Sequence, residues 1–425
     1  MVAALFISFV FFVMINIPIA VSIALASMTA IAVQDGIPFV IVVQKMFTAL
    51  DSFPFMAVPF FILAGLLMEH GGISRRLVDF AASIAGRTYG GLAMVAVVAS
   101  MFFGAVSGSA AATAAAIGSI LIPSMVERGY DKGYATAVQA ASGTLGVMIP
   151  PSIPLIVYGV LTGESVGALF MGGVLPGIMV GASLMLVAWY QAKKKGYGGA
   201  EGGGLKRVFT SFWDAFFALL MPVIILGGIY GGYFTPTEAA VIAVVYAFFV
   251  GALVYRELKM KNLGGILVNA VVSTAVIMFI IATASVFGWV LASEQVPQMV
   301  ASAILSVTQN TVVILMLINL LLLVLGTFLE TTAAIIITAP VFLPVITQIG
   351  IDPLHFGIIM VVNLAVGMVT PPLGVCLFVG CGIAGISLED ITRAVLPFLV
   401  MMIIDIAIIT YIPAVSTFLP RLMGM

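Results

Sequence analysis

Long apolar stretches separated by short polar segments run along the whole chain. A helix that crosses a bilayer needs about 20 apolar residues. The candidate spans are residues 2–33 (interrupted near Pro18), 52–69, 133–163, 168–190, 208–229, 236–254, 263–292, 354–384 and 388–411. Two further apolar stretches, 89–126 and 311–346, are each long enough for two limbs. Two shorter, more polar segments, 71–87 and 294–309, are expected to be amphipathic connectors. The pattern predicts an all-α polytopic membrane protein.

Composition supports this prediction and excludes several other classes. The 425 residues are 63% hydrophobic and 8% charged, whereas soluble domains carry about 25% charged residues. The net charge of −1 gives no basic field for nucleic acid. Neither a phosphate-binding GxxxxGK[ST] loop nor an HExxH zinc helix is present. The two histidines, His70 and His355, are far apart in sequence and are expected to be surface groups rather than metal ligands.

The positions of lysine and arginine test the proposed path through the membrane. If Lys193, Lys194 and Lys195 face the cytoplasm, 14 of the 16 basic residues fall on that side, including Arg87 and Arg128. Only Lys45 and Arg421 fall on the opposite side. This bias is what the positive-inside rule requires. It does not decide whether the limbs of the two-limbed stretches cross the bilayer fully or re-enter on the same side.

The two halves of the chain resemble each other at a constant spacing of 221 residues. The matching glycine, proline and aspartate residues are Pro123 and Pro344, Gly129 and Gly350, Asp131 and Asp352, Gly146 and Gly367, Pro150-Pro151 and Pro371-Pro372, Gly159 and Gly380, and Pro176 and Pro397. Arg128 falls inside, while Gln348 at the corresponding end of the second two-limbed stretch falls outside, so the copies run through the bilayer in opposite directions. Inverted repeats with broken helices are typical of secondary transporters.

The repeat predicts the domain organisation. Residues 1–190 form the first repeat and residues 208–425 form the second, each with scaffold helices, one hairpin and one broken helix. The basic, glycine-rich segment 191–207 is the cytoplasmic linker between them. A duplicated bundle could also be purely architectural, but the broken segments favour a transporter.

Both repeats contain glycine and proline residues at bilayer depth. In the span 133–163 these are Gly143, Gly146, Pro150, Pro151 and Pro154, and in its counterpart they are Gly367, Pro371, Pro372 and Gly374. Proline removes a backbone donor and breaks the helix, and freed carbonyl groups inside a membrane must be buried, hydrated or bound. Carbonyl oxygens suit a hard cation such as sodium, as they suit calcium. The alternative is a simple proline kink.

The two-limbed stretches predict re-entrant hairpins whose tips lie near these breaks. The first contains Ser107, Gly108, Ser109 and Thr113 at its centre, and the second contains Gly326, Thr327, Glu330, Thr331 and Thr332. A Ser-Gly-Ser turn between apolar limbs suits a hairpin tip, and the N-terminus of the following helix can direct its amides at an anion. The small-residue run 104–118 could instead serve close helix packing.

Glu330, Glu238 and Asp405 are among the acidic residues that lie within predicted spans. A carboxylate in a membrane span is costly and is functional by default, which makes Glu330 the most informative of them. Its alternative role is a structural partnership with a nearby hydroxyl. Glu238 follows Thr235-Pro236-Thr237, where helix capping is at least as good an explanation. Asp405 has no assigned role.

Taken together, these motifs resemble the large membrane subunit of TRAP (tripartite ATP-independent periplasmic) transporters. The resemblance extends along essentially the whole chain and rests on LDSFPFMAVPFFILAG (50–65), FFGAVSGSAAATAAAIGS (102–119), MIPPSIPLIVYG (148–159), GGYFTPTEAA (231–240), GTFLETTAAII (326–336) and NLAVGMVTPPLG (363–374). It implies an elevator-type transporter of the bacterial inner membrane, in which a mobile transport domain carries both hairpins and both broken helices against a fixed scaffold.

The resemblance also implies site residues. A first sodium site would involve Ser107, Ser109, Gly143, Gly146, Ile149 and Pro151. A second sodium site would involve Gly326, Thr327, Gly367, Thr370 and Pro372. The substrate carboxylate would lie between the tips, near Ser109, Ser152 and Glu330. Similar members that handle sialic acid carry aspartate where this chain has Glu330, so the identity of the carboxylate stays open among C4-dicarboxylates, sialic acid and related sugar acids.

Two partner proteins are implied in the same way: a small four-helix membrane subunit and a soluble periplasmic protein that captures the substrate. Neither is part of this chain, so we expect no transport without them, and membrane lipid surrounds the assembly. Two other functions remain open. A self-sufficient sodium–dicarboxylate symporter would transport alone, and a scaffold subunit without an ion site would tolerate loss of the breaks. An intramembrane enzyme is a remote possibility because no catalytic pair is visible.

Overall fold

The computed structural model describes residues 1–34, 36–85, 89–198 and 204–424. Within these ranges every regular element is a helix, and ten candidate spans are long and apolar enough to cross a membrane. The all-helical prediction is therefore confirmed. Arg87 of the charge pattern and residues 199–203 of the predicted linker lie outside the described residues.

Each half of the chain passes through the same order of elements. This order is two helices, a long helix, a short connecting helix, a hairpin, a broken helix and a closing long helix. The first half contains α1 (Val2–Met14), α2 (Ile19–Val33), α3 (Val40–Leu50), η1 (Phe53–Met56), α4 (Ala57–His70), α5 (Ile73–Ala85), α6 (Gly91–Ser107), α7 (Ala110–Glu127), α8 (Lys132–Gly143), α9 (Leu145–Met148), α10 (Ile153–Thr162) and α11 (Val166–Lys195). In this half α3, η1 and α4 together form the long helix.

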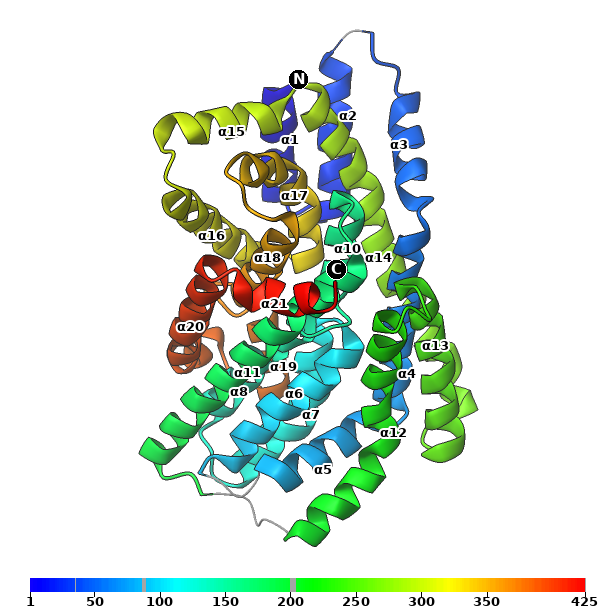
Figure 1. Ribbon diagram of the computed structural model, residues 1–425, viewed down its shortest axis with the longest axis vertical. Coiled ribbons are helices and arrows are strands. Elements are labelled where there is room, and N and C mark those ends of the chain that lie inside the picture. The colour runs from blue at the N-terminus through cyan, green and yellow to red at the C-terminus, as the bar shows by residue number, and fades with distance from the viewer. Residues whose placement is uncertain (35, 86–88, 199–203, 425) are drawn as a thin grey trace.

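The second half repeats the order with a single uninterrupted long helix. It contains α12 (Leu205–Tyr230), α13 (Pro236–Phe249), η2 (Val250–Val254), α14 (Met260–Ser293), α15 (Val296–Val307), α16 (Thr311–Phe328), α17 (Thr331–Gln348), α18 (Pro353–Gly367), α19 (Val375–Ala384) and α20 (Leu388–Tyr411), followed by α21 (Ala414–Leu422). The connecting helices α5 and α15 lie at opposite ends of the molecule (Figure 1), as inverted repeats require.

Two helices were not predicted from the sequence. The first, α3, has only 11 residues and carries Gln44 and Lys45, so it lacks the length and apolarity of a span. The second, α21, is nine residues long and includes Ser416, Thr417 and Arg421. A window of about 20 apolar residues detects neither helix, because both are short and partly polar.

The helices pack in two groups. In one, α4 lies along α13, and α14 lies along α2, α3 and α4. In the other, the hairpins and the broken helices pack with α11 and α20. The broken helices exchange partners between the repeats, because α10 packs on α17 of the second hairpin and α19 packs on α7 of the first. This exchange ties both hairpins into one unit.

The broken helices begin and stop at equivalent positions in the two repeats. Asp131 caps α8 by accepting from the Tyr134 amide at 2.9 Å, and Asp352 caps α18 by accepting from the Leu354 amide at 2.9 Å. Such caps stabilise a helix by about 0.5–2 kcal/mol. Each helix then stops before its Pro-Pro pair, at Met148 or at Gly367, and resumes at Ile153 or at Val375. The predicted breaks are confirmed.

Glycine pairs bring each hairpin against the broken helix that follows it. A Cβ atom placed on Gly104 of α6 would lie 2.9 Å from the Cα atom of Gly146. A Cβ atom on Gly367 would lie 2.5 Å from the backbone of Gly326 in α16. Gly146 and Gly367 are equivalent in the repeat, so the same close backbone contact is formed twice.

We expect Gly367→Ala to destabilise the protein, because the added methyl group meets backbone atoms of Gly326 that cannot rotate away. Overpacking of this kind costs about 1–3 kcal/mol. Gly382→Ala in α19 is the matched control, since a Cβ atom there meets nothing within 4 Å. Thermal unfolding in detergent should show a lower midpoint for Gly367→Ala only. Equal midpoints for the two variants would contradict the tight contact.

Candidate ion and substrate site

The first hairpin turns sharply at its centre. The limb α6 ends at Ser107, and Gly108 adopts a left-handed conformation with φ of +60°. Ser109 then caps α7, because its hydroxyl accepts from the Ala112 amide at 3.4 Å. Glycine tolerates the left-handed region without the steric cost of a side chain. The Ser-Gly-Ser sequence therefore forms the predicted tip.

Three oxygen atoms gather at this tip. The hydroxyl oxygens of Ser107 and Thr113 are 2.8 Å apart, and the Thr113 hydroxyl donates to the Ser109 carbonyl at 2.8 Å. The Ser107 hydroxyl also lies 3.4 Å from the Ser109 carbonyl oxygen. Oxygen ligands of a hard cation at about 2.3–2.6 Å stand roughly 3.3–3.7 Å apart in octahedral geometry. The 3.4 Å separation lies within that range, whereas the two 2.8 Å separations are hydrogen-bond distances about 0.5 Å below it. The oxygens are of the type that a hard cation prefers, and they would move slightly apart to ligate one.

The tip lies directly on the first helix break. The Ile153 amide at the start of α10 donates to the Gly108 carbonyl at 3.4 Å. A Cβ atom on Gly108 would be 3.1 Å from the Pro151 carbonyl oxygen. A Cβ atom on Gly146 would be 2.5 Å from the Ser109 carbonyl oxygen and 2.3 Å from the Thr113 hydroxyl. The predicted residues of the first tip and the first break are thus brought together, and Thr113 joins them.

The second tip repeats this arrangement with different chemistry. The Gly374 amide donates to the Thr327 carbonyl at 3.3 Å, which links the tip to the second break. Gly326 packs on Gly367 through backbone atoms. The Thr370 hydroxyl donates to the Val366 carbonyl at 2.9 Å. Gly374 and Ile153 are equivalent in the repeat, so each break donates one amide to the tip of its own hairpin.

Glu330 occupies the position in the second hairpin that Ser109 occupies in the first. Its side chain caps α17, accepting from the amides of Thr332 at 2.9 Å and Ala333 at 3.3 Å. The Thr332 hydroxyl also donates to the carboxylate at 3.1 Å. The residue as a whole is nevertheless exposed in the isolated chain, although its carboxylate is engaged in the cap. Glu330 therefore combines the capping role with a position at the surface of the second tip.

The remaining predicted residues differ in accessibility. The hydroxyl of Ser152 is fully buried and donates to the Val147 carbonyl at 2.6 Å. Ser152 also caps α10. Gly143 packs on Ala114 of α7, and a Cβ atom on Gly177 of α11 would approach Ile149. These residues shape the first break from inside.

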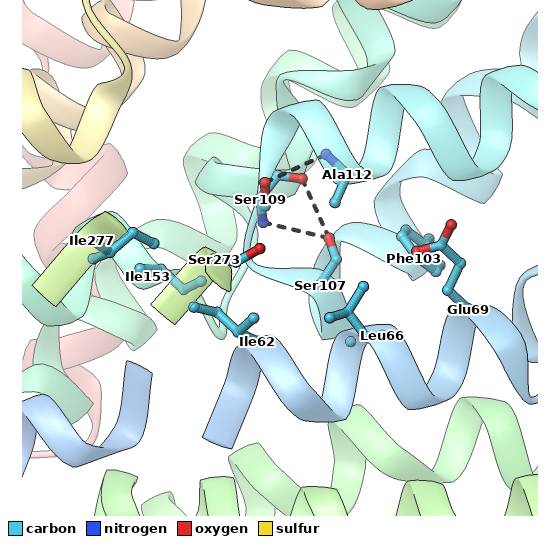
Figure 2. A pocket seen from close by; sticks show the side chains of 11 residues that line it. Ile62, Leu66, Glu69, Phe103, Ser107, Ser109, Ala112, Ile153, Ser273 and Ile277 are labelled. Carbon is cyan, nitrogen blue, oxygen red and sulfur yellow. Dashed lines mark hydrogen bonds between the residues drawn. The ribbon is translucent and has the colours of Figure 1, made fainter. Parts of the chain in front are cut away.

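A cavity of about 140 Å³ opens beside the first tip (Figure 2). Ser107, Ser109 and Ala112 form its wall on the hairpin, together with Phe103 and Ile153. The opposite wall comes from Ile62, Gly65, Leu66 and Glu69 of α4 and from Ser273 and Ile277 of α14. The cavity therefore lies between the two helix groups, at the oxygen cluster.

Sequence reasoning missed two residues of this region. Thr113 was noted near the tip but was not assigned to a site, although it lies four residues after the Ser109 cap and so reaches back to its carbonyl. Glu69 was not singled out, although a carboxylate within an apolar span is itself a signal of function. Among the described residues, no group of three or more His, Cys, Asp and Glu side chains gathers as metal ligands. The oxygens at the first tip are hydroxyl and carbonyl groups, and the second tip adds the Glu330 carboxylate.

The structure also shows the surroundings of three other residues that the sequence analysis discussed: Glu238, Asp405 and His355. Glu238 forms a capping box with Thr235, so its capping role is confirmed. Asp405 is buried and accepts from the Ser183 hydroxyl of α11. The prediction that His355 is a surface group was wrong. Its ring is buried and contacts the Ser416 hydroxyl at 2.6 Å and the Thr410 carbonyl at 3.2 Å, because the unpredicted helix α21 covers it.

Comparisons with known proteins give consistent results. A family model described as "Tripartite ATP-independent periplasmic transporter, DctM component" matches residues 6–415. The isethionate TRAP transporter permease protein DctMQ of Oleidesulfovibrio alaskensis is 46% identical over 411 residues, covering 96% of this chain and 65% of that relative. The C4-dicarboxylate TRAP transporter large permease protein DctM of Rhodobacter capsulatus is 39% identical and covers 96% of both chains. The sialic acid TRAP transporter large permease protein SiaM of Vibrio cholerae is 40% identical, covering 96% of this chain and 95% of that relative.

The fold is also similar to a solved structure, the YdaH transporter of Alcanivorax borkumensis. The TM-score is 0.58 at 13% identity, covering 84% of this chain and 86% of that chain. At this identity the likeness concerns the fold alone. The matched family model and the relatives, together with the ten candidate spans, show that the chain belongs to the DctM-component family of TRAP transporters and is a multi-pass inner-membrane transporter subunit rather than an enzyme.

Proposed function

We propose that this chain is the large transmembrane subunit of a sodium-coupled importer of a small organic anion. The observation that carries the proposal is the pairing of each hairpin tip with a helix break, and above all the oxygen cluster of Ser107, Ser109 and Thr113. Hard cations prefer oxygen ligands of this kind. The equivalent pairing at Gly326, Thr327 and Gly374 supports a second sodium site.

Sodium supplies the driving force in this proposal. Each positive charge that moves inward gains about 2.3 kcal/mol per 100 mV of membrane potential. Two or more ions at the tips would also offset the negative charge of the anion in a low-dielectric region. Each tip is linked to its helix break by a backbone hydrogen bond, which the amide of Ile153 donates in the first repeat and the amide of Gly374 donates in the second. A bound ion would add further contacts between tip and break and so would order each tip.

Movement between the two helix groups completes the transport cycle. We infer an elevator mechanism, in which the hairpins and broken helices slide as one unit against α4, α13 and α14. Its support is the packing of α10 on α17 and of α19 on α7, which joins the hairpins. The short helices α5 and α15 connect the two groups, so they are the segments that would reorient.

The anion is placed between the tips. Ser109 begins α7 and Glu330 begins α17, so the N-termini of both second limbs point toward the breaks. Helix N-termini favour negative charge. Ser109 would contact the acid group of the substrate. Glu330 already places its own carboxylate at the N-terminus of α17, so it would approach that acid group only through a bound sodium ion. The buried Ser152 would hold the first break in shape.

The relatives support partners and a cargo class. Their names specify isethionate, C4-dicarboxylate and sialic acid as transported compounds, so we propose a small organic acid as the cargo here. The family description supports a periplasmic binding protein that delivers this cargo. We further propose a small four-helix membrane subunit as the second partner.

The function can be tested by reconstituting the chain in liposomes with its small subunit and binding protein. Labelled organic acids should enter when a sodium gradient points inward, and potassium should not replace sodium. Omission of the binding protein should abolish uptake. Uptake by this chain alone would instead identify a self-sufficient symporter, and uptake that ignores sodium would contradict the proposed ion sites.

Thr113→Val should weaken sodium binding, because it removes one oxygen of the cluster while keeping the size of the side chain. Polar interactions with a charge are worth about 1.5–3 kcal/mol, so we expect the half-saturating sodium concentration to rise roughly 10- to 100-fold. Thr338→Val is the matched control. Thr338 is also a buried helical threonine, bonded to the Ala334 carbonyl at 2.6 Å, but it lies in α17 away from the first tip. Equal sodium dependence in both variants would remove Thr113 from the site.

A further inference from the structure

Glu69 is a carboxylate of the other helix group that lines the same cavity as the first tip, where it lies beside Phe103 (Figure 2). It lies near the end of α4, within the apolar span Phe53–His70, and is partly buried. Among the described residues neither ion pair involves Glu69, and no side chain or backbone group forms a hydrogen bond with its carboxylate. An acidic side chain in a membrane span normally has a partner or a function.

The position of Glu69 is fixed by close packing of α4 on the tip. A Cβ atom on Gly65 would lie 3.4 Å from the Cα atom of Ser107. Glu69 follows Gly65 by four residues, so both lie on the same face of α4, one turn apart. Glu69 lines the cavity that also contains Ser107 and Ser109. In Figure 2, Ser273 and Glu69 lie on either side of Ser107.

The cavity is small and is lined by a few polar side chains among apolar ones. Its polar groups are the hydroxyls of Ser107, Ser109 and Ser273 and the carboxylate of Glu69, and most of the rest is apolar, including Leu66, Phe103 and Ile277. A cavity of about 150 Å³ holds benzene, which has six non-hydrogen atoms. The cavity of about 140 Å³ therefore has room for a portion of the cargo that contains roughly six non-hydrogen atoms. A single carboxylate in such a cavity strongly influences which groups can enter.

We propose that Glu69 is a specificity-determining residue that selects cargo with one acid group and a hydroxyl or ammonium donor at its other end. This inference rests on the proposed function, which places the acid group of the cargo at the Ser109 tip. A short cargo extending from there toward α4 brings its second group to Glu69. A donor can hydrogen-bond to the carboxylate, whereas a second carboxylate is repelled in a low-dielectric cavity. The chain should therefore disfavour dicarboxylates.

The test compares three four-carbon probes on the full-length chain in sodium-containing nanodiscs. The probes are 4-hydroxybutyrate, 4-aminobutyrate and succinate, and their dissociation constants are measured by calorimetry or by thermal shift. We expect succinate to bind at least about tenfold more weakly than the two donors. Glu69→Gln, which keeps the size of the side chain, should reduce the ratio of the succinate dissociation constant to those of the two donor probes by a similar factor. Glu127→Gln, at the exposed end of α7, is the matched control and should leave the ratio unchanged.

Several results would overturn the proposal. Succinate binding as tight as 4-hydroxybutyrate binding in the native chain would do so without any variant, as would a chain that binds none of the probes. An unchanged probe ratio in Glu69→Gln, or a change confined to sodium affinity, would also exclude the assigned role. If the glutamine variant fails to fold, Glu69→Asp provides the second variant. This variant keeps the charge, so it should still bind the two donor probes more tightly than succinate. Loss of that preference would count against the proposal.

The sodium sites can be tested separately from Glu69. A thermal shift produced by sodium but not by potassium, in the absence of any probe, reports on the tips and breaks alone. Loss of that shift would count against the proposed function, whereas a normal sodium shift with no donor preference would count only against the role of Glu69.

Discussion

The structure depends on one constraint: backbone amide and carbonyl groups inside a membrane must have partners. Each broken helix interrupts its own hydrogen bonding at bilayer depth, between Met148 and Ile153 and between Gly367 and Val375. Each hairpin tip supplies one carbonyl to the break, at Gly108 and at Thr327. The hairpins are therefore held in place by the backbone groups that the breaks leave without helical partners.

Glycine makes these contacts possible. The pairs Gly104–Gly146 and Gly326–Gly367 let the backbones of two helices meet at distances that a side chain would prevent. The same contact appears in both repeats, and it brings Ser107, Ser109 and Thr113 together in the first. Packing and the proposed ion chemistry thus have a common structural origin. The close approach of the two backbones places the oxygens of the tip against the helix break instead of against lipid.

Much of this architecture could be predicted from the sequence, because the repeat placed glycine, proline and aspartate at fixed positions. Asp131 and Asp352 cap helices, and the Pro-Pro pairs lie in breaks, as these residue types require. The helix α21 and its contact with His355 could not be predicted, since nine residues that include polar side chains are too short and too polar to match a membrane span. Glu69 acquires its position only through the packing of α4 on the first tip, which the sequence spacing does not reveal.

Cation binding at both pairs of tip and break should slow the local opening of the backbone there. It can be measured by hydrogen–deuterium exchange of the full chain in sodium or in potassium at equal ionic strength. Sodium should slow exchange at residues 107–113 and 149–153 and also at residues 326–332 and 368–374, while the distant helices α12 and α13 are unaffected. Identical exchange in the two salts at all four segments would contradict it.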